Sequence, residues 1–98
     1  MNNLSFTVIE CCCEKIIYAE CPVCGYLTIE GHGDICCICF WEYDGFVEYK
    51  GHLFSSMNGM TIEEARTNFY DIGACYEDFL KYVIPTEARK YYIHSDDK

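Results

Sequence analysis

This chain of 98 residues carries 16 acidic and seven basic side chains, a formal net charge of −9. Its length fits one small domain with a thin core, and no segment approaches the roughly 18 apolar residues of a membrane span. The acidic balance, with basic residues scattered along the chain, opposes direct nucleic-acid binding. We therefore expect a cytoplasmic protein that contacts neither nucleic acid nor membrane, with its nine cysteines kept reduced.

The first 20 residues are predicted to form two strands that pair as a hairpin. Residues 4–10 alternate between apolar and polar side chains, and a second apolar cluster covers residues 16–18. The triplet Cys11-Cys12-Cys13 lies between them. In an extended strand Cys12 points away from its neighbours, so the three thiols cannot all face one ion. Two interpretations stay open for the triplet: small apolar filling, or a second metal or redox site.

Two CxxC pairs follow, and they are separated by an 11-residue spacer long enough for a β-hairpin. Four thiolates at this spacing are typical of a zinc ribbon. We predict one structural Zn²⁺ ion, although the pattern does not distinguish zinc from iron. The predicted ligands are Cys21, Cys24, Cys36 and Cys39. A filled site of this kind is closed to catalysis, and folding is expected to depend on the metal.

The spacer is predicted to hold a strand at residues 26–29 and a turn at residues 30–34, where His32 is interpreted as a solvated turn residue. A dense aromatic run then surrounds the turn dipeptide Asp44-Gly45 and is predicted to form a hairpin beside the metal. Exposed residues of this run suit a protein interface. The residues proposed to contact a partner are Glu42, Tyr43, Asp44, Glu48 and Tyr49.

A helix is predicted to begin at Ile62, because Thr61 and Glu64 form a capping-box pattern, and to end at Gly73. A second short helix is expected over about 76–83, stopping before Pro85. The tail is expected to add one helical turn and then fray. The predicted organisation is one α+β domain over 1–98: N-terminal strands at 1–20, zinc ribbon and aromatic hairpin at 21–49, a loop at 50–60, a cap of two short helices at 61–84 and a tail at 85–98.

Several motifs resemble the bacterial cysteine-rich CPCC family, over roughly residues 21–79. They are Cys21-Pro22-Val23-Cys24-Gly25-Tyr26-Leu27-Thr28, Ile35-Cys36-Cys37-Ile38-Cys39-Phe40-Trp41-Glu42-Tyr43-Asp44-Gly45, Asn58-Gly59 and Glu64-Ala65-Arg66-x-Asn68-Phe69. Val23 replaces the middle cysteine of the family's name motif, and Cys37 stands where a proline is usual. If Val23 serves in place of that cysteine, the middle position is dispensable for metal binding. The resemblance implies small proteins that accompany secreted toxins as immunity proteins.

Three functional hypotheses remain. The first is a non-enzymatic protein that neutralises a toxin with a basic surface, such as a nuclease, by direct binding. The second is a cysteine-dependent enzyme with Cys12, Cys37 or Cys75 as nucleophile, although no local motif pairs these thiols with His32, His52 or His94. The third is a zinc-ribbon adaptor that binds other proteins within a larger transcription or translation assembly.

Overall fold

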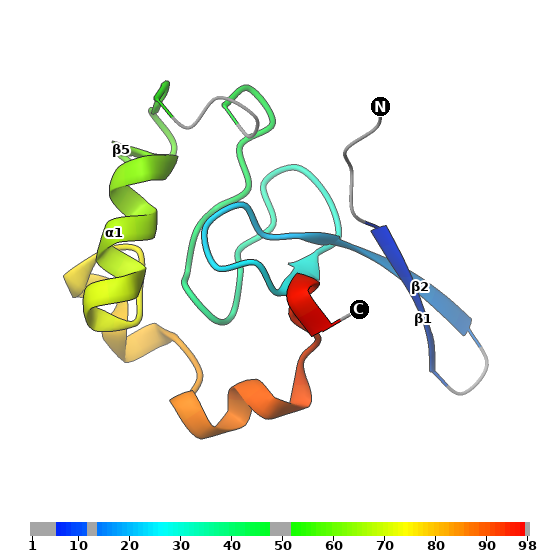
Figure 1. Ribbon diagram of the computed structural model, residues 1–98. Coiled ribbons are helices and arrows are strands. Elements are labelled where there is room, and N and C mark those ends of the chain that lie inside the picture. Colours follow the sequence, from blue (N-terminus) through cyan, green and yellow to red (C-terminus); the bar gives the residue numbers. More distant parts are fainter. Residues whose placement is uncertain (1–5, 12–13, 48–51, 98) are drawn as a thin grey trace.

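The computed structural model describes residues 6–11, 14–47 and 52–97 (Figure 1). A three-stranded antiparallel sheet contains β1 (Phe6–Cys11), β2 (Glu14–Glu20) and β3 (Leu27–Ile29), in the order β1-β2-β3. The predicted N-terminal hairpin is therefore confirmed: β1 pairs with β2 from Phe6 opposite Ala19 to Cys11 opposite Glu14. In Figure 1 this hairpin lies on the opposite side of the molecule from helix α1 (Ile62–Ile72), with the cysteine-bearing loops between them.

The spacer between the two CxxC pairs does not fold back on itself as a hairpin. Strand β3, which follows the first pair, returns to β2, with Ala19 opposite Ile29 and Glu20 opposite Leu27. The residues before the second pair bond instead to those after it, through an isolated bridge between Ile35 and Glu42. Each CxxC pair is thus the turn of its own small hairpin. We call the turns the first knuckle (residues 21–25) and the second knuckle (residues 36–40).

This pairing also replaces the aromatic hairpin predicted around Asp44-Gly45. The amide of Tyr43 donates to the Asp34 carbonyl at 2.8 Å, and the amide of Cys36 donates to the Trp41 carbonyl at 2.9 Å. The backbone just before Asp44 is therefore hydrogen-bonded to the segment that precedes the second knuckle, and not to residues after Asp44-Gly45. Residues 45–47 do form a turn, as predicted, but no strand occurs within residues 40–47.

The segment predicted as a loop at residues 50–60 contains a small hairpin, with β4 (Phe54–Ser55) antiparallel to β5 (Met60–Thr61). The four-residue turn between the two strands ends with Asn58-Gly59. Gly59 adopts a left-handed φ of 73°, and its amide donates to the Ser55 carbonyl at 2.7 Å. Helix α1 then begins at Ile62 with both bonds of the predicted capping box between Thr61 and Glu64, and ends at left-handed Gly73.

Three 3-10 helices complete the described chain: η1 (Glu77–Tyr82), η2 (Thr86–Tyr91) and η3 (Ser95–Asp97). The second predicted helix therefore exists at the expected place but as a 3-10 helix. Tyr76 provides no side-chain cap at its start, and Pro85 disfavours α-helical backbone in the residue before it. The tail makes the expected further turn, η2, but does not then fray, because residues 93–95 bond to the first knuckle and β3.

The two knuckles pack into the hydrophobic core, around fully buried residues such as Ile38, Trp41 and Ile62. Helix α1 contributes Ile62 and Ala65 to this cluster. None of the helices in the described part of the chain is long and apolar enough to cross a bilayer. The core is therefore built around the cysteines.

Candidate metal centre

Four cysteine side chains from the two knuckles meet inside the core. They are the four predicted ligands, Cys21, Cys24, Cys36 and Cys39, and their Sγ atoms all lie within 4.8 Å of one another. Contacts cross between the knuckles: Cys21 Sγ lies 3.5 Å from Cys39 Sγ, and Cys24 Sγ lies 3.6 Å from Cys36 Sγ. Zn–S bonds of about 2.3 Å place tetrahedral sulfurs about 3.8 Å apart. The sulfurs are therefore spaced to hold one tetrahedral metal ion.

The two knuckles have the same backbone hydrogen bonds. In the first, the Cys21 amide donates to the Tyr26 carbonyl at 2.8 Å and the Gly25 amide donates to the Cys21 carbonyl at 2.9 Å. In the second, the Cys36 amide donates to the Trp41 carbonyl at 2.9 Å and the Phe40 amide donates to the Cys36 carbonyl at 2.8 Å. This shared geometry aims two thiols from each turn at the same point.

The fourth position after each leading cysteine has left-handed backbone, with φ of 82° at Gly25 and 71° at Phe40. Phe40 is the one non-glycine residue with positive φ among those that the structure describes. A bulky residue there costs of order 1–3 kcal/mol and persists only when its surroundings fix it. The ring of Phe40 packs against Phe79 and stacks on Tyr82, at centroid distances of 4.9 and 5.2 Å. Helix η1 thus holds the second knuckle in this conformation.

Hydrogen bonds to the Cys36 sulfur favour its thiolate form. The neighbouring Cys21, Cys24 and Cys39 thiols, together with Thr28, donate hydrogen bonds that lower the pKa of Cys36 well below its ordinary value. Thr28 Oγ1 lies 3.0 Å from the sulfur, and the Ile38 amide donates to it at 3.4 Å. Burial, by contrast, raises the pKa of Cys21 and of Cys39. A divalent cation bound by the four sulfurs would displace the protons that the thiols carry.

The donor set is four sulfurs, and each of the four cysteines is at most 6% exposed. A buried tetrahedral set of four thiolates suits zinc or an iron–sulfur centre and disfavours magnesium or calcium, which prefer oxygen. Four protein ligands leave no open coordination position for a substrate or a reactive water. The chemistry that this arrangement fits is structural: cross-linking two turns that the sequence separates.

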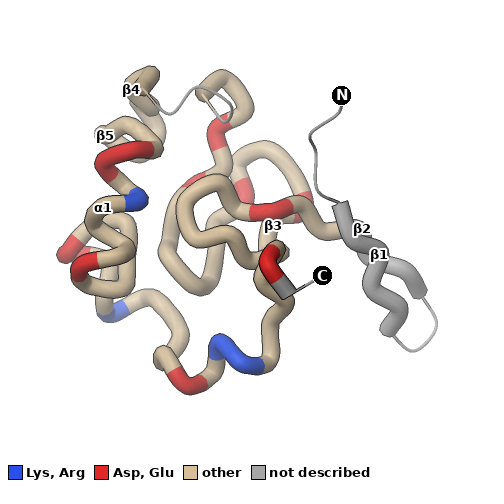
Figure 2. Tube along the Cα trace, viewed as in Figure 1, with Lys and Arg blue, Asp and Glu red and all other residues tan. Residues whose placement is uncertain are grey.

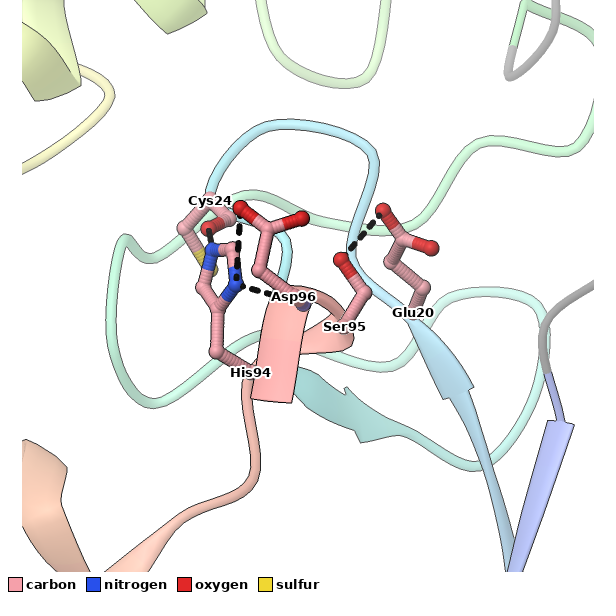
Figure 3. Close-up of polar contacts among 5 residues, drawn as sticks. All are labelled: Glu20, Cys24, His94, Ser95 and Asp96. Carbon is pink, nitrogen blue, oxygen red and sulfur yellow. Dashed lines mark hydrogen bonds and ion pairs between the residues drawn. The ribbon is translucent and has the colours of Figure 1, made fainter. Parts of the chain in front are cut away.

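The C-terminal segment covers the first knuckle, as Figure 3 shows. His94 Nε2 lies 3.0 Å from the Cys24 carbonyl oxygen, and the Asp96 amide donates to His94 Nδ1 at 3.0 Å. Since Nδ1 accepts, Nε2 carries the proton and donates to Cys24. The Ser95 amide donates to the Gly25 carbonyl at 2.8 Å, and Ser95 Oγ donates to Glu20 at 3.3 Å. We call residues 93–96 the C-terminal latch.

Two polar side chains of α1 also hold the metal centre, and sequence reasoning did not assign them this role. Arg66 Nε donates to the Pro22 carbonyl of the first knuckle at 2.8 Å. Asn68 Nδ2 donates to the Cys75 carbonyl at 2.8 Å, and the Cys75 amide in turn donates to the Cys39 carbonyl at 2.8 Å. Both side chains belong to the motif Glu64-Ala65-Arg66-x-Asn68-Phe69. Their place in that motif was the feature of the sequence that could have indicated this role.

The residues predicted to contact a partner occupy different environments. Glu42 and Tyr43 are half-buried. The Asn58 side chain accepts from the Glu42 amide at 2.9 Å and donates to the Glu42 carbonyl at 2.8 Å. Asp44 is only 4% exposed, and its carboxylate accepts from Ser55 Oγ at 2.7 Å and from the Phe46 amide at 3.1 Å. This carboxylate therefore joins two segments inside the molecule, and its contact with a partner stays a prediction. Glu48 and Tyr49 lie outside the described residues.

Two further cysteines lie near the centre without joining it. Cys75 is fully buried, and burial raises its pKa to about 12. Cys37 is partly exposed, and burial raises its pKa as well. Both shifts oppose the thiolate that a nucleophilic cysteine needs. Of the triplet, Cys12 and Cys13 lie outside the described residues.

The histidine at the turn after β3 is bonded within the protein. His32 Nδ1 accepts from the Gly45 amide at 3.3 Å, and its ring meets Phe46 edge-on at 6.2 Å between centroids. His32 therefore links the turn at residues 30–34 to the turn at residues 45–47. His52 is exposed.

Comparison with protein-family models matches residues 19–90 to the family described as Cysteine-rich CPCC. The match contains all four clustered cysteines together with Arg66 and Asn68, and it ends before the C-terminal latch. No curated protein and no solved structure matches the chain significantly. Because the matched residues cover most of the 98-residue chain, the protein belongs to the cysteine-rich CPCC family.

Proposed function

We propose that this protein is a non-enzymatic binding module whose fold is held by one structural zinc ion. The support is the buried set of four thiols at tetrahedral spacing, which is part of the hydrophobic core. Structural zinc contributes roughly 10–16 kcal/mol in small zinc-binding peptides, which exceeds the stability of many domains. Metal analysis tests the zinc assignment: one colourless zinc ion per chain is expected, and a coloured iron-loaded protein would contradict it.

The proposed partner is a protein with a basic surface. The observation that carries this proposal is the charge of residues 18–47, the segment with all four clustered cysteines, which contains five carboxylates and no lysine or arginine. Four thiolates around a divalent cation would add a further −2. The basic residues coloured in Figure 2 lie outside this segment, on α1 and on the 3-10 helices, and Arg66 of α1 reaches the segment to bond to the Pro22 carbonyl. Such a surface attracts a basic protein and repels nucleic acid.

We further propose that the partner is a bacterial toxin and that binding neutralises it. A nuclease is the class that best fits the charge, because its basic substrate cleft is complementary to an acidic inhibitor. Large exposed aromatic side chains support a binding role, since such residues are enriched at protein interfaces. Phe46, Phe54 and Tyr70 are 85%, 63% and 90% exposed.

A cysteine-dependent enzyme has less support. An activated thiol has a lowered pKa and a base within reach. Cys37 and Cys75 instead have raised pKa values, and His32 and His94 bond to the backbone of Gly45 and of Cys24. Uniformly slow alkylation of the zinc-loaded protein is expected, whereas one thiol that reacts far faster than the others would favour the enzyme.

The test of the binding proposal is an affinity pull-down of the tagged, zinc-loaded protein at low and moderate salt. The expected result is one stoichiometric basic protein whose association rate falls as salt rises. Adding the zinc-loaded protein should then inhibit the isolated partner's activity. A captured partner whose activity is unaffected would contradict neutralisation. Recovery of ribosomal or polymerase subunits would favour an adaptor role.

A further inference from the structure

A cleft of about 520 Å³ lies on the protein surface beside the metal centre. It is bordered by β3, by the loop that leads into the second knuckle, and by the end of η2 with the residues that follow it. The six lining residues that define its chemistry are Glu30, Asp34, Ile35, Tyr91, Tyr92 and Ile93. We call it the tyrosine cleft. Its volume is in the range of sites that bind small ligands or single side chains.

One wall of the tyrosine cleft is apolar and aromatic, yet it is exposed. Tyr91, Tyr92 and Ile93 are 77%, 37% and 38% exposed, and Ile35, which also lines the cleft, is 45% exposed. Scattered apolar residues at a surface need no explanation, but a contiguous group that lines a hollow marks a site of interaction. Tyrosine faces are also suited to cations, which they attract through the ring quadrupole.

The tyrosine cleft is also lined by two carboxylates, those of Glu30 and Asp34, which we call its rim. Asp34 Oδ2 accepts a hydrogen bond from the Glu30 amide at 2.8 Å, which fixes the position of the Asp34 side chain. Glu30 itself is exposed. Within the described part of the chain, neither carboxylate forms an ion pair. Lys90 Nζ lies 5.3 Å from the centroid of the Tyr91 ring, so one cation already contacts the aromatic side of the cleft without pairing with the rim.

We propose that the tyrosine cleft receives an arginine side chain presented by the protein partner. A guanidinium group is flat enough to stack on a tyrosine ring while its N–H groups fork onto a carboxylate. Tyr91 and Tyr92 supply the rings, and Glu30 and Asp34 supply the acceptors. Ile35 and Ile93 supply an apolar surface for the aliphatic part of the side chain.

This inference rests on the proposed function for its partner, but the cleft can be tested alone. The zinc-loaded, ¹⁵N-labelled protein is titrated with a short acetylated Ala-Arg-Ala amide peptide and with its citrulline counterpart, which has the same shape without the charge. Amide shifts are expected at residues 30–35 and 91–93, with about tenfold weaker binding of the citrulline peptide. Equal binding of the two peptides, or shifts confined to other residues, would overturn the proposal.

Two double variants test whether the rim carboxylates are responsible for binding of the arginine peptide. The double variant Glu30→Gln/Asp34→Asn should weaken the arginine peptide about tenfold, since it removes both charged acceptors. The matched control, Glu63→Gln/Asp71→Asn, removes the same two charges from α1 and should bind as the unaltered protein does. Equal weakening by the two double variants would show a general charge effect and overturn the assignment to the cleft.

The pull-down separates this inference from the proposed function. If the rim variant and the unaltered protein capture the same basic partner equally well, the cleft proposal fails while the binding function stands. If the arginine peptide binds in the cleft but no basic protein is captured, the binding function fails while the cleft stands as an arginine site.

Discussion

Phe40 occupies in the second knuckle the left-handed backbone position that Gly25 occupies in the first, with φ of 71° and 82°. A positive φ is unfavourable for a residue with a Cβ atom, and the two knuckles tolerate it in different ways. Gly25 has no Cβ, whereas Phe40 accepts an unfavourable backbone conformation and is held there by Phe79 and Tyr82. The second knuckle is therefore joined to η1 by the very residue that is strained.

Replacement of Phe40 separates backbone strain from ring packing. Phe40→Ala and Phe40→Gly both lose the contacts with η1, so both should destabilise the protein by roughly 2–4 kcal/mol. Glycine should be the better replacement by about 1 kcal/mol, because only the alanine variant retains the left-handed strain. Denaturation midpoints of the zinc-loaded proteins measure the difference. A more stable alanine variant would show that the positive φ at this position carries no cost.

Addition of a methyl group at Gly25 should displace the C-terminal latch. A Cβ there would lie 2.6 Å from His94 Nε2, whereas a Cβ at Gly33, which has a similar φ of 85°, would meet nothing within 4 Å. Gly33→Ala should therefore cost only backbone strain, about 1–2 kcal/mol, and Gly25→Ala should cost more. The rate of zinc transfer to a chelator should rise in Gly25→Ala alone.

The double variant Gly25→Ala/His94→Ala tests whether the clash with His94 is the cause. Removing the imidazole should recover part of the stability lost in Gly25→Ala, so the two substitutions should not be additive. Strict additivity would mean that the ring moves aside without cost.

Replacement of each clustered cysteine should lower the zinc content below one ion per chain. Cys24→Ser is the informative variant, because Cys24 lies at the knuckle that the latch covers. Cys37→Ser is the matched control: it removes a neighbouring thiol that lies outside the cluster and should retain one zinc. Metal analysis after gel filtration measures both, and loss of zinc in Cys37→Ser would place that thiol among the ligands.

Removal of the metal should unfold the core and not merely loosen two loops. The clustered cysteines pack in the same group as Trp41, whose side chain is fully buried. A strong zinc chelator at neutral pH should therefore shift the emission of this single tryptophan to longer wavelength, and added zinc should reverse the change. Emission that does not respond to chelation would show a core that is stable without metal.

Local signals in the sequence predicted the parts of the fold that local interactions determine. Thr61 and Glu64 fix the start of α1, and the two CxxC spacings fix which sulfurs meet. The pairing of the spacer could not be predicted in this way. Sequence distance alone does not show whether Leu27 pairs with residues before it or after it. Leu27 pairs with Glu20, which precedes it, because the first knuckle turns the chain back toward β2.

Long-range contacts explain the remaining errors. The tail was predicted to fray from Ser95 onward, but His94 and Ser95 bond to Glu20, Cys24 and Gly25, which lie far away in the sequence. The burial of Asp44 likewise depends on Ser55, a residue in a segment that was predicted to be a loop.

The separation of 70 positions between Cys24 and His94 has a consequence for assembly. During synthesis both knuckles emerge before the latch exists, so metal loading can precede closure of the first knuckle. Closing so long a loop is entropically costly in an unfolded chain, and a metal-bound core that already holds the intervening residues together lowers that cost. Binding of the ion and its retention are then separate events, the first governed by the cysteines and the second by residues that are made later.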